Sequence, residues 1–361
     1  MRALIAAGGT GGHIYPGIAV AKEIVRRDPE SEVRFVGTER GLESKLVPQA
    51  GFELSIIDSA GLKNVRPIAR ARALIVIPKS LLTARGLIRR FRPDIAIGAG
   101  GYVSGPVVLT AALLKVPTLV MESNALPGWT NRRLARFVDR AAVSFEAGLP
   151  YFRGKGVVTG NPVRREFFEI PARQRSAPEF SILVFGGSQG AKAINGAVIA
   201  ALPLMEGLRD VLRITHQTGE ADFERVCAAY LNAGWAGSGN VQRYIDDMVA
   251  SFADADLVIC RGGATTTAEL IAAGKAALMV PFPFAADDHQ RKNAEALANA
   301  GAARMILQRD LSGERLAHEI ATLARDPGRI TAMEHAGRKL ARGDAAAAVV
   351  DMIEELVISK Q

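Results

Sequence analysis

His13 is the first residue of this chain whose type and surroundings suggest chemistry. It ends a glycine-rich stretch, Gly8-Gly9-Thr10-Gly11-Gly12-His13, that follows an apolar run and precedes residues with helical spacing. A strand, a glycine turn and a helix in this order bring backbone N–H groups to a helix start, where they can bind an anion. A single imidazole beside such a turn is suited to accept a proton, so His13 is a candidate general base.

The spacing of these glycines excludes two common nucleotide-binding loops. The dinucleotide fingerprint requires a glycine where Ile14 stands, and the triphosphate loop requires Gly-Lys-Ser/Thr where His13 stands. A dinucleotide oxidoreductase is therefore the least favoured class. Taken alone, the stretch is also consistent with a packing turn of an α/β domain.

Polar clusters follow two later apolar runs. Glu122, Ser123 and Asn124 come directly after the run 116–121, and polar residues at this place build the sites of open α/β sheets. The stretch 262–267, Gly-Gly-Ala-Thr-Thr-Thr, is typical of a helix N-terminus and suits a diphosphate. Glu269, in the first helical turns, can accept hydrogen bonds from a ribose diol. Helix capping beside a solvated glutamate is the alternative explanation.

These clusters alternate with strand and helix patterns along the whole chain. The predicted strands cover residues 3–7, 33–37, 54–57, 94–98, 116–121, 141–144, 181–185, 257–260 and 276–281. A segment rich in Gly, Pro and charge, 154–178, separates two such series. We therefore predict an α/β protein with two Rossmann-like, doubly wound parallel-sheet domains. The spacing of Val349, Met352, Ile353 and Leu356 predicts an amphipathic last helix.

The composition is that of a globular protein with uneven charge. Of the 361 residues, 48% are hydrophobic and 23% are charged. The net charge is +8, and residues 1–164 hold 24 Lys or Arg against 12 Asp or Glu, so this half is expected to meet an anionic partner. The only cysteines, Cys227 and Cys260, favour a reducing compartment and no disulfide or metal site. We expect neither a signal peptide nor a membrane span.

Positive charge is densest in residues 59–93, which contain nine basic side chains and no acidic one. The predicted helix has an apolar face and a basic face: Leu81, Ala84, Ile88 and Phe91 against Arg85, Arg89 and Arg92. It is either an ordinary surface helix or a face that presses on anionic lipid. Few aromatic residues interleave the charges, so nucleic acid is not an expected partner.

Six motifs in a fixed order give the chain a family resemblance. They lie at residues 8–13, 100–106, 160–164, 186–191, 245–248 and 260–269. Together they resemble the peptidoglycan glycosyltransferases that move N-acetylglucosamine from UDP-N-acetylglucosamine to a lipid-linked muramoyl-pentapeptide. The resemblance implies the GT-B architecture: Rossmann-like domains of residues 1–163 and 164–340 facing a cleft, and a last helix, 341–361, returning to the first domain.

The resemblance also implies the reaction and its place. An inverting transfer to the 4-hydroxyl of the N-acetylmuramoyl unit, on undecaprenyl diphosphate, would form a β-1,4-linked disaccharide. The enzyme would be peripheral at the cytoplasmic face of the cell membrane, with residues 63–92 on the anionic surface. We expect no cofactor and no obligatory metal, because helix N-termini, Ser188 and Arg164 can take the charge of the leaving diphosphate.

Site residues are implied at the positions that match the family's motifs. His13 matches a proposed base and Glu122 a carboxylate near the acceptor, and His13 is preferred over Glu122 as the base. In the second domain, Ile245 would hold uracil through its main chain and Glu269 would hold the ribose. The positions implied to bind the donor are Thr10, Gly11, Gly12, Asn124, Arg164, Ser188, Ile245, Ala264, Thr265, Thr266, Thr267, Ala268, Glu269 and Gln290.

Three positions depart from the family pattern. Met121 and Ser123 stand where His and Gln are usual, which puts an acceptor role for both in doubt. Gly262 stands where Ser or Ala is usual. Two other functions remain open on the same fold: a UDP-sugar 2-epimerase or another two-domain transferase, and a nucleotide-sensing or lipid-binding module without catalysis.

Overall fold

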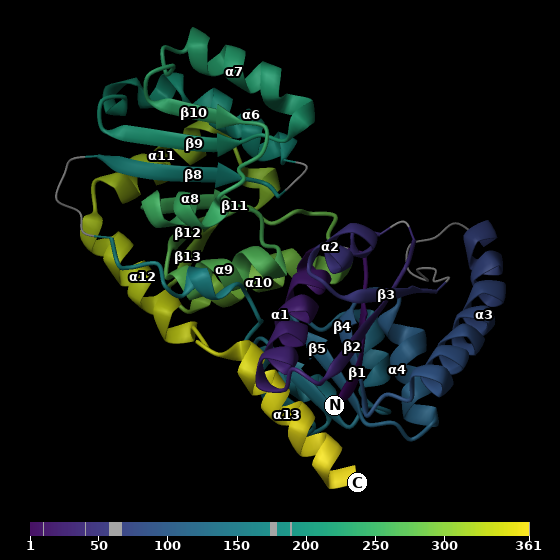
Figure 1. Cartoon of the computed structure of the whole chain (residues 1–361). Helices are drawn as coiled ribbons and strands as arrows, with labels where there is room; N and C mark the ends of the chain where they lie inside the picture. Colours follow the sequence, from purple (N-terminus) through teal and green to yellow (C-terminus); the bar gives the residue numbers. More distant parts are fainter. Residues whose placement is uncertain (10, 40, 58–66, 174–178, 188–189, 361) are drawn as a thin grey trace. The chain divides into compact units, whose positions relative to one another are not determined.

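The structure, a computed structural model, describes residues 1–9, 11–39, 41–57, 67–173, 179–187 and 190–360, without the side chains of residues 67–77. The chain divides into two compact units (Figure 1). Unit 1 comprises Met1–Val163 and Asp344–Gln361, and unit 2 comprises Arg164–Gly343. The predicted Thr10 and Ser188 lie outside the described residues.

Unit 1 contains a parallel sheet whose described strands lie in the order β3-β2-β1-β4-β5-β6-β7. The strands are β1 (Arg2–Ala7), β2 (Glu32–Gly37), β3 (Glu53–Ile56), β4 (Ile95–Gly100), β5 (Thr118–Glu122), β6 (Arg140–Val143) and β7 (Gly156–Val158). The helices are α1 (Gly11–Arg27), α2 (Glu43–Gln49), α3 (Pro67–Phe91), α4 (Ser104–Leu113), α5 (Trp129–Leu134), η1 (Glu146–Phe152) and α13 (Ala345–Lys360).

Unit 2 contains a second parallel sheet, in the order β10-β9-β8-β11-β12-β13 over its described strands. The strands are β8 (Phe180–Phe185), β9 (Leu212–Gln217), β10 (Gly239–Gln242), β11 (Leu257–Cys260), β12 (Ala276–Met279) and β13 (Ala303–Met305). The helices are η2 (Arg165–Phe167), α6 (Lys192–Ala201), η3 (Pro203–Leu208), η4 (Glu220–Asp222), α7 (Phe223–Asn232), α8 (Met248–Asp254), α9 (Ala264–Ala273), η5 (Ala286–Asp288), α10 (His289–Asn299), η6 (Gln308–Asp310), α11 (Gly313–Ala324) and α12 (Pro327–Leu340).

Both sheets follow the same winding order, and this order positions the site. Each chain segment starts in the middle of its sheet, winds to one edge and then crosses to the other side. The crossing puts β1 beside β4 in unit 1 and β8 beside β11 in unit 2. Ligands of open α/β sheets bind at such switch points, outside the carboxyl ends of the strands. The predicted fold class, two doubly wound parallel-sheet domains, is confirmed.

The strands of unit 1 are buried on both faces. Alternating residues of β1 belong to two cores: Ala3, Ile5 and Ala7 pack with α1 and α13, and Leu4 and Ala6 pack with α3 and α4. The last helix, α13, is part of the first core, and Arg27 of α1 bonds Asp351 at 2.7 Å and Glu354 at 3.0 Å. The C-terminal segment therefore belongs structurally to unit 1 (Figure 1).

Four strands were not predicted from the sequence: β7, β9, β10 and β13. Three of them have only three or four residues and lie at sheet edges, where apolar runs are short. β9 has only two apolar residues, Leu212 and Ile214, and the others are Arg, Thr, His and Gln, which hides its pattern. Pro16 is the sixth residue of α1, because the glycine turn itself forms the first turn of the helix.

The two-faced helix predicted in residues 81–92 is confirmed. Ala84, Ile88 and Phe91 are buried in α3, while Arg85 and Arg89 are exposed. Across the described ranges, we find no helix whose length and apolar character would let it cross a bilayer.

Candidate functional site

The first glycine turn holds His13 in one orientation. Its Nδ1 lies 3.1 Å from the carbonyl oxygen of Gly8. A carbonyl only accepts hydrogen bonds, so Nδ1 carries the proton and Nε2 the lone pair of the neutral ring. A Cβ at Gly100 would lie 2.3 Å from Cδ2 of His13, so the imidazole packs against bare backbone at a φ of 118°. This arrangement suits a base that acts through Nε2.

The turn after β4 supports the turn after β1. A Cβ at Gly101 would lie 2.2 Å from the oxygen of Gly8, so the two turns touch. The buried Ser104 accepts the N–H of Gly100 at 3.0 Å, and its Oγ lies 2.9 Å from the oxygen of Ala6. Residues 100–106 thus seat the turn that carries His13, a role that sequence reasoning did not assign to Ser104. Gly11 and Gly12 begin α1, where N–H groups have no partner within the helix.

Glu122 ends β5, and hydrogen-bond donors of its own chain surround its carboxylate. Oε1 accepts the N–H of Asn124 at 2.9 Å and its side-chain amide at 3.1 Å. Oε2 accepts the N–H of Gly128 at 2.9 Å and the amide of Asn131 at 2.9 Å. These four bonds fill the acceptor capacity of a carboxylate. The geometry therefore favours a positioning role for Glu122, which fixes Asn124 and the segment leading to α5.

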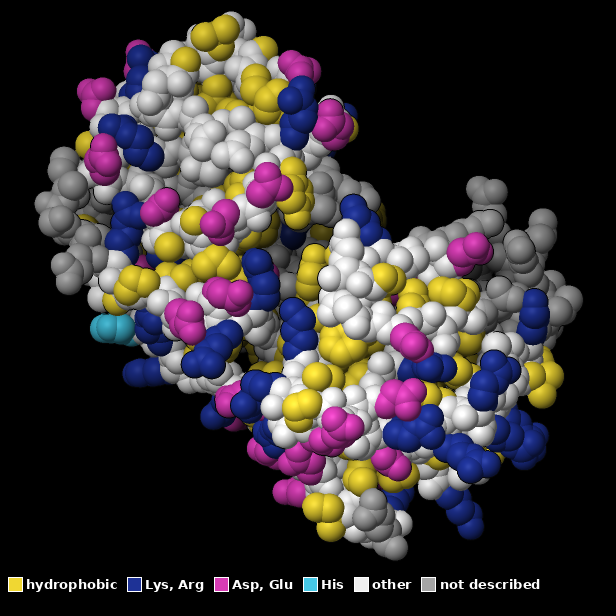
Figure 2. Space-filling view, viewed as in Figure 1, with side chains coloured by type: hydrophobic (Ala, Val, Ile, Leu, Met, Phe, Trp, Pro, Cys, Tyr) yellow, Lys and Arg dark blue, Asp and Glu magenta, His cyan; other side chains and the backbone are white. Residues whose placement is uncertain are grey.

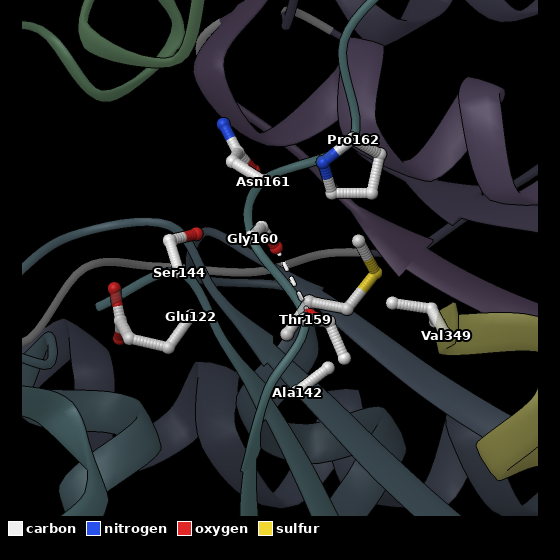
Figure 3. Close-up of a pocket in the computed structure, with 9 residues that line it drawn as sticks. Glu122, Ala142, Ser144, Thr159, Gly160, Asn161, Pro162 and Val349 are labelled. Atoms are coloured by element: carbon white, nitrogen blue, oxygen red, sulfur yellow. Dashed lines mark hydrogen bonds between the residues drawn. The ribbon is translucent and has the colours of Figure 1, made fainter. Parts of the chain in front are cut away.

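A small pocket lies beside Glu122, at the carboxyl ends of β5, β6 and β7 (Figure 3). Ser144 and Thr159 line it from β6 and β7, and Val349 of α13 closes it from the other side. Its empty volume is about 140 Å³, but it leaves no room for a water-sized sphere. This pocket is a packing gap rather than a sugar site.

Met121 and Ser123, the residues that depart from the family pattern, have structural roles. The Met121 side chain is buried in the core between the sheet and α1. The buried Ser123 donates to Oδ1 of Asn161 at 2.9 Å and so connects the β5 turn to the segment after β7. His13 follows β1 and Glu122 ends β5, and β4 lies between these two strands, so the strand axes are roughly 10 Å apart.

In unit 2, the predicted helix N-terminus is present and is α9, capped by Gly263. A Cβ at Gly262 would lie 2.2 Å from the carbonyl oxygen of Gln290, so only glycine allows α10 to come this close without a shift. The buried Asn293 donates to the oxygen of Gly262 at 3.0 Å. Gln290 itself accepts the N–H of Phe282 at 3.0 Å. The start of α9 is therefore fixed from α10, and the glycine departure has a packing reason.

The hydroxyls of α9 have different roles. Thr267 is fully buried and donates to the carbonyl of Gly263 at 2.8 Å, which caps the helix internally. The hydroxyl of Thr265 is buried and, within the described part of the chain, has no hydrogen-bond partner. A buried hydroxyl without a partner is costly, so Thr265 is the residue of the run best placed to bond a ligand. Ala264 and Thr266 are half-buried, and Ala268 is buried.

Burial raises the pKa of Glu269 to about 7, and the charge of Arg164 acts in the opposite direction. The Arg164 guanidinium stacks 5.0 Å above the ring of Phe167, which fixes it beside α9. A carboxyl group with a pKa near 7 changes its charge in the physiological range. The structure thus brings together Arg164 and the α9 run, two of the predicted donor-binding elements.

Gln217 holds two further elements together, a role that sequence reasoning missed. Its Oε1 accepts the N–H of Ile245 at 2.9 Å, and its Nε2 donates to the carbonyl of Gly187 at 2.9 Å. The N–H of Ile245 is therefore engaged within the protein. Gln217 ends β9, so it lies at the carboxyl end of the sheet, as does the start of α9. The position of Gln217 at the end of a strand could have indicated this role, but β9 was not predicted from the sequence.

A buried hydrogen-bond network supports this end of the sheet. His216 lies between Asn195 and Tyr230, at 3.1 and 3.2 Å, and burial lowers the pKa of the imidazole to about 4. Asn195 in turn donates to the carbonyl of Thr218 at 3.0 Å. A Cβ at Gly190 would lie 1.8 Å from that oxygen, so the loop before α6 rests directly on the end of β9. Neutral His216 therefore helps to hold Gly190, just before α6, against the end of β9.

Comparison with known proteins identifies the family. The glycosyltransferase family 28 N-terminal domain matches residues 3–143, and the C-terminal domain of the same family matches residues 181–350. The chain belongs to glycosyltransferase family 28. Family 28 relatives include a UDP-N-acetylglucosamine–N-acetylmuramyl-(pentapeptide) pyrophosphoryl-undecaprenol N-acetylglucosamine transferase of Anaeromyxobacter sp., 50% identical over 99% of this chain and 94% of the relative.

Solved structures agree with this membership. A crystal structure of MurG from Acinetobacter baumannii has a TM-score of 0.81 and 33% identity, and the match covers 98% of this chain and 99% of that one. A UDP-GlcNAc 2-epimerase from Neisseria meningitidis, solved bound to UDP-GlcNAc, has a TM-score of 0.66 over 98% and 100% of the two chains. Its 14% identity shows a shared fold alone. The family models and the MurG structure therefore agree on the fold of the chain.

We predict that Gly100→Ala displaces His13. The added methyl group would meet the imidazole at 2.3 Å, at a backbone φ of 118° that favours glycine. Transferase kcat should fall on the order of 10²-fold, as for ångström-scale misplacement of a reacting group, and thermal denaturation should show a lower melting temperature. Gly86→Ala in α3 is the matched control, since a Cβ there meets nothing within 4 Å. Full activity of Gly100→Ala would show that the ring need not lie there.

Proposed function

We propose that this glycosyltransferase moves N-acetylglucosamine from UDP-N-acetylglucosamine to the 4-hydroxyl of the N-acetylmuramoyl-pentapeptide on undecaprenyl diphosphate. The observation that carries the proposal is the near-full-length identity to relatives named for this transfer. The geometry supports it, because unit 1 presents an imidazole lone pair and unit 2 a helix N-terminus suited to a diphosphate. The product is the β-1,4-linked disaccharide precursor of peptidoglycan.

Unit 2 binds the donor in this proposal. The N–H groups at the start of α9 and the hydroxyl of Thr265 face the diphosphate, and Arg164 adds a positive charge. Glu269 accepts hydrogen bonds from the ribose hydroxyls. The uracil is held at Ile245. Because the N–H of Ile245 is bonded to Gln217, the uracil binds either to the carbonyl of Ile245 or to its N–H after the bond to Gln217 breaks. Charge on the leaving diphosphate is thus stabilised without an obligatory metal.

Unit 1 supplies the base. Nε2 of His13 takes the proton of the 4-hydroxyl as its oxygen bonds the anomeric carbon. The bond from that carbon to the diphosphate breaks on the opposite face, and its electron pair leaves with UDP, so α inverts to β. A positioned base contributes roughly 10²–10⁴-fold. Glu122 takes no proton in this proposal, because its own oxygens are filled, and it fixes the position of Asn124.

The acceptor's lipid chain requires an enzyme at the membrane, and we place the contact on α3. Its exposed residues include Lys79, Arg85, Arg89 and Arg90 beside the exposed apolar Leu82. On the face drawn in Figure 2, Lys and Arg side chains gather at the lower right, where Figure 1 places α3. Residues 63–66 of the predicted contact lie outside the described part of the chain. Anionic lipid at the cytoplasmic face would attract this helix.

We predict that the purified chain transfers labelled N-acetylglucosamine to a short-chain lipid-linked acceptor in the presence of EDTA. Because the base is an imidazole, His13→Ala should lower kcat by about 10²–10⁴-fold with little change in donor affinity. His318→Ala, which removes an exposed imidazole on α11, should retain full activity. A loss of activity in EDTA that magnesium restores would refute metal independence. Turnover of the donor without any acceptor would instead favour a 2-epimerase.

We predict that donor binding strengthens as the pH rises through 7. The ionised Glu269 carboxylate accepts both ribose hydroxyls, and its pKa is about 7. The dissociation constant of UDP-N-acetylglucosamine, measured by calorimetry without acceptor, should fall up to about tenfold between pH 6 and pH 8. Glu269→Gln should remove this pH dependence. Glu206→Gln, an exposed carboxylate of unit 2, should leave it intact; a flat wild-type profile would exclude Glu269 as the ribose acceptor.

We predict that α3 gives the chain a preference for anionic vesicles. Each basic residue at an anionic surface contributes about 1 kcal/mol, so R85Q/R89Q/R90Q should weaken cosedimentation with phosphatidylserine vesicles on the order of 10²-fold. The control R325Q/R329Q/R342Q removes the same charge from exposed positions of unit 2. Equal binding of the wild type to anionic and neutral vesicles would refute the proposed contact.

A further inference from the structure

A buried carboxylate lies on the other side of the peptide group that His13 bonds. Glu43, the first residue of α2, is fully buried. Its Oε2 accepts the N–H of Gly9 at 3.0 Å. Its Oε1 accepts the N–H of Thr38 at 2.8 Å and the hydroxyl of Thr38 at 2.7 Å. Glu43 belongs to none of the six sequence motifs.

The peptide between Gly8 and Gly9 is therefore bonded at both ends. Its N–H donates to the Glu43 carboxylate, and its carbonyl accepts the Nδ1 proton of His13. Hydrogen bonds arranged in such a chain polarise one another. When the N–H of a peptide group donates a hydrogen bond to an anion, the carbonyl oxygen of the same peptide group becomes a stronger acceptor. The order carboxylate, peptide, imidazole resembles the carboxylate–histidine pair of hydrolases with one amide inserted.

Glu43 is ionised at neutral pH. Burial acts to raise its pKa, but the hydrogen bonds from Thr38 and Gly9 outweigh it, so that the pKa lies below the usual range. A negative charge is thus permanent at this place. The surroundings are shaped for it, since a Cβ at Gly41 would lie 2.0 Å from Oε2 and one at Gly37 would lie 2.4 Å from Cγ of Glu43.

We propose that Glu43 is a positioning residue for catalysis: through the Gly8–Gly9 peptide it holds His13 in the Nδ1–H tautomer and raises the basicity of Nε2. Glu43 touches no substrate and takes no proton in the reaction. The proposal deepens the proposed function, because it rests on His13 as the base. The other titratable groups on the described elements around this end of α1 are Glu39, Lys45, Tyr15 and Tyr102, and each is largely exposed.

The first test observes the imidazole directly, in free protein labelled with ¹⁵N-histidine. His13→Gln assigns the signal among the five histidines. We expect the neutral ring of the wild type to carry its proton on Nδ1. A proton on Nε2 would overturn the proposal. This measurement uses no substrate. It therefore tests the relay, by which we mean the hydrogen-bonded chain from Glu43 through the Gly8–Gly9 peptide to His13, separately from the proposed reaction.

The second test removes the charge with Glu43→Gln. We expect a mixed tautomer, an imidazole pKa lowered by about half a unit as expected for an indirect charge, and kcat about 10- to 10²-fold lower with unchanged donor affinity. The acidic limb of the kcat/KM profile should move to lower pH by the same amount. Glu30→Gln removes the same charge from an exposed position of unit 1 and should change none of these.

Thr38→Val distinguishes the charge of Glu43 from a purely structural role. The variant keeps the carboxylate but removes one of its hydrogen-bond donors. If the charge is what matters, Thr38→Val should lower thermal stability but leave the tautomer and the pH profile as in the wild type. If Glu43→Gln folds and titrates like the wild type, the relay does not operate. If Glu43→Gln does not fold, the wild-type tautomer and Thr38→Val still decide the question.

Discussion

Close approach of backbones at the carboxyl ends of two parallel sheets is the constraint on which the site depends. A side chain at Gly101 would meet the oxygen of Gly8 at 2.2 Å, and one at Gly190 would meet the oxygen of Thr218 at 1.8 Å. At Gly262 the distance to Gln290 would again be 2.2 Å. Each contact lies where a loop leaves its strand. The glycine motifs therefore serve first to pack loops against one another, and this packing sets the places of the chemical groups.

The sequence predicts the fold class because buried parallel strands are continuous apolar runs. It does not predict which strands become neighbours. β1 pairs with β4, Ala3 beside Ile95, although β2 and β3 lie between them in the chain, so this pairing follows from the crossover. For this reason the meeting of the turns after β1 and β4 was not foreseen, although both turns were recognised. β9 was missed because its polar residues, which include His216, are bonded inside unit 2.

Site residues were predicted by type and place, and their roles could not be separated from the sequence. Glu122, Thr267 and Gln290 have the polar groups that a ligand needs, but the structure gives each of them partners within the chain. Loop support and ligand binding require the same residue types at strand ends. Only geometry distinguishes the filled carboxylate of Glu122 from the buried hydroxyl of Thr265, which has no hydrogen-bond partner among the residues that the structure describes.

Charge distinguishes the starts of α1 and α9, two helices that each follow a strand and a glycine turn. At the start of α1, the buried Glu43 takes the N–H of Gly9 and puts a negative charge beside the turn. Such a charge opposes a phosphate and stabilises an imidazolium. At the start of α9, the first turn contains no acidic residue, and Arg164 lies near Glu269. The same strand–turn–helix unit therefore favours proton transfer in unit 1 and an anion in unit 2, because a single carboxylate from α2 reverses the electrostatics of the first.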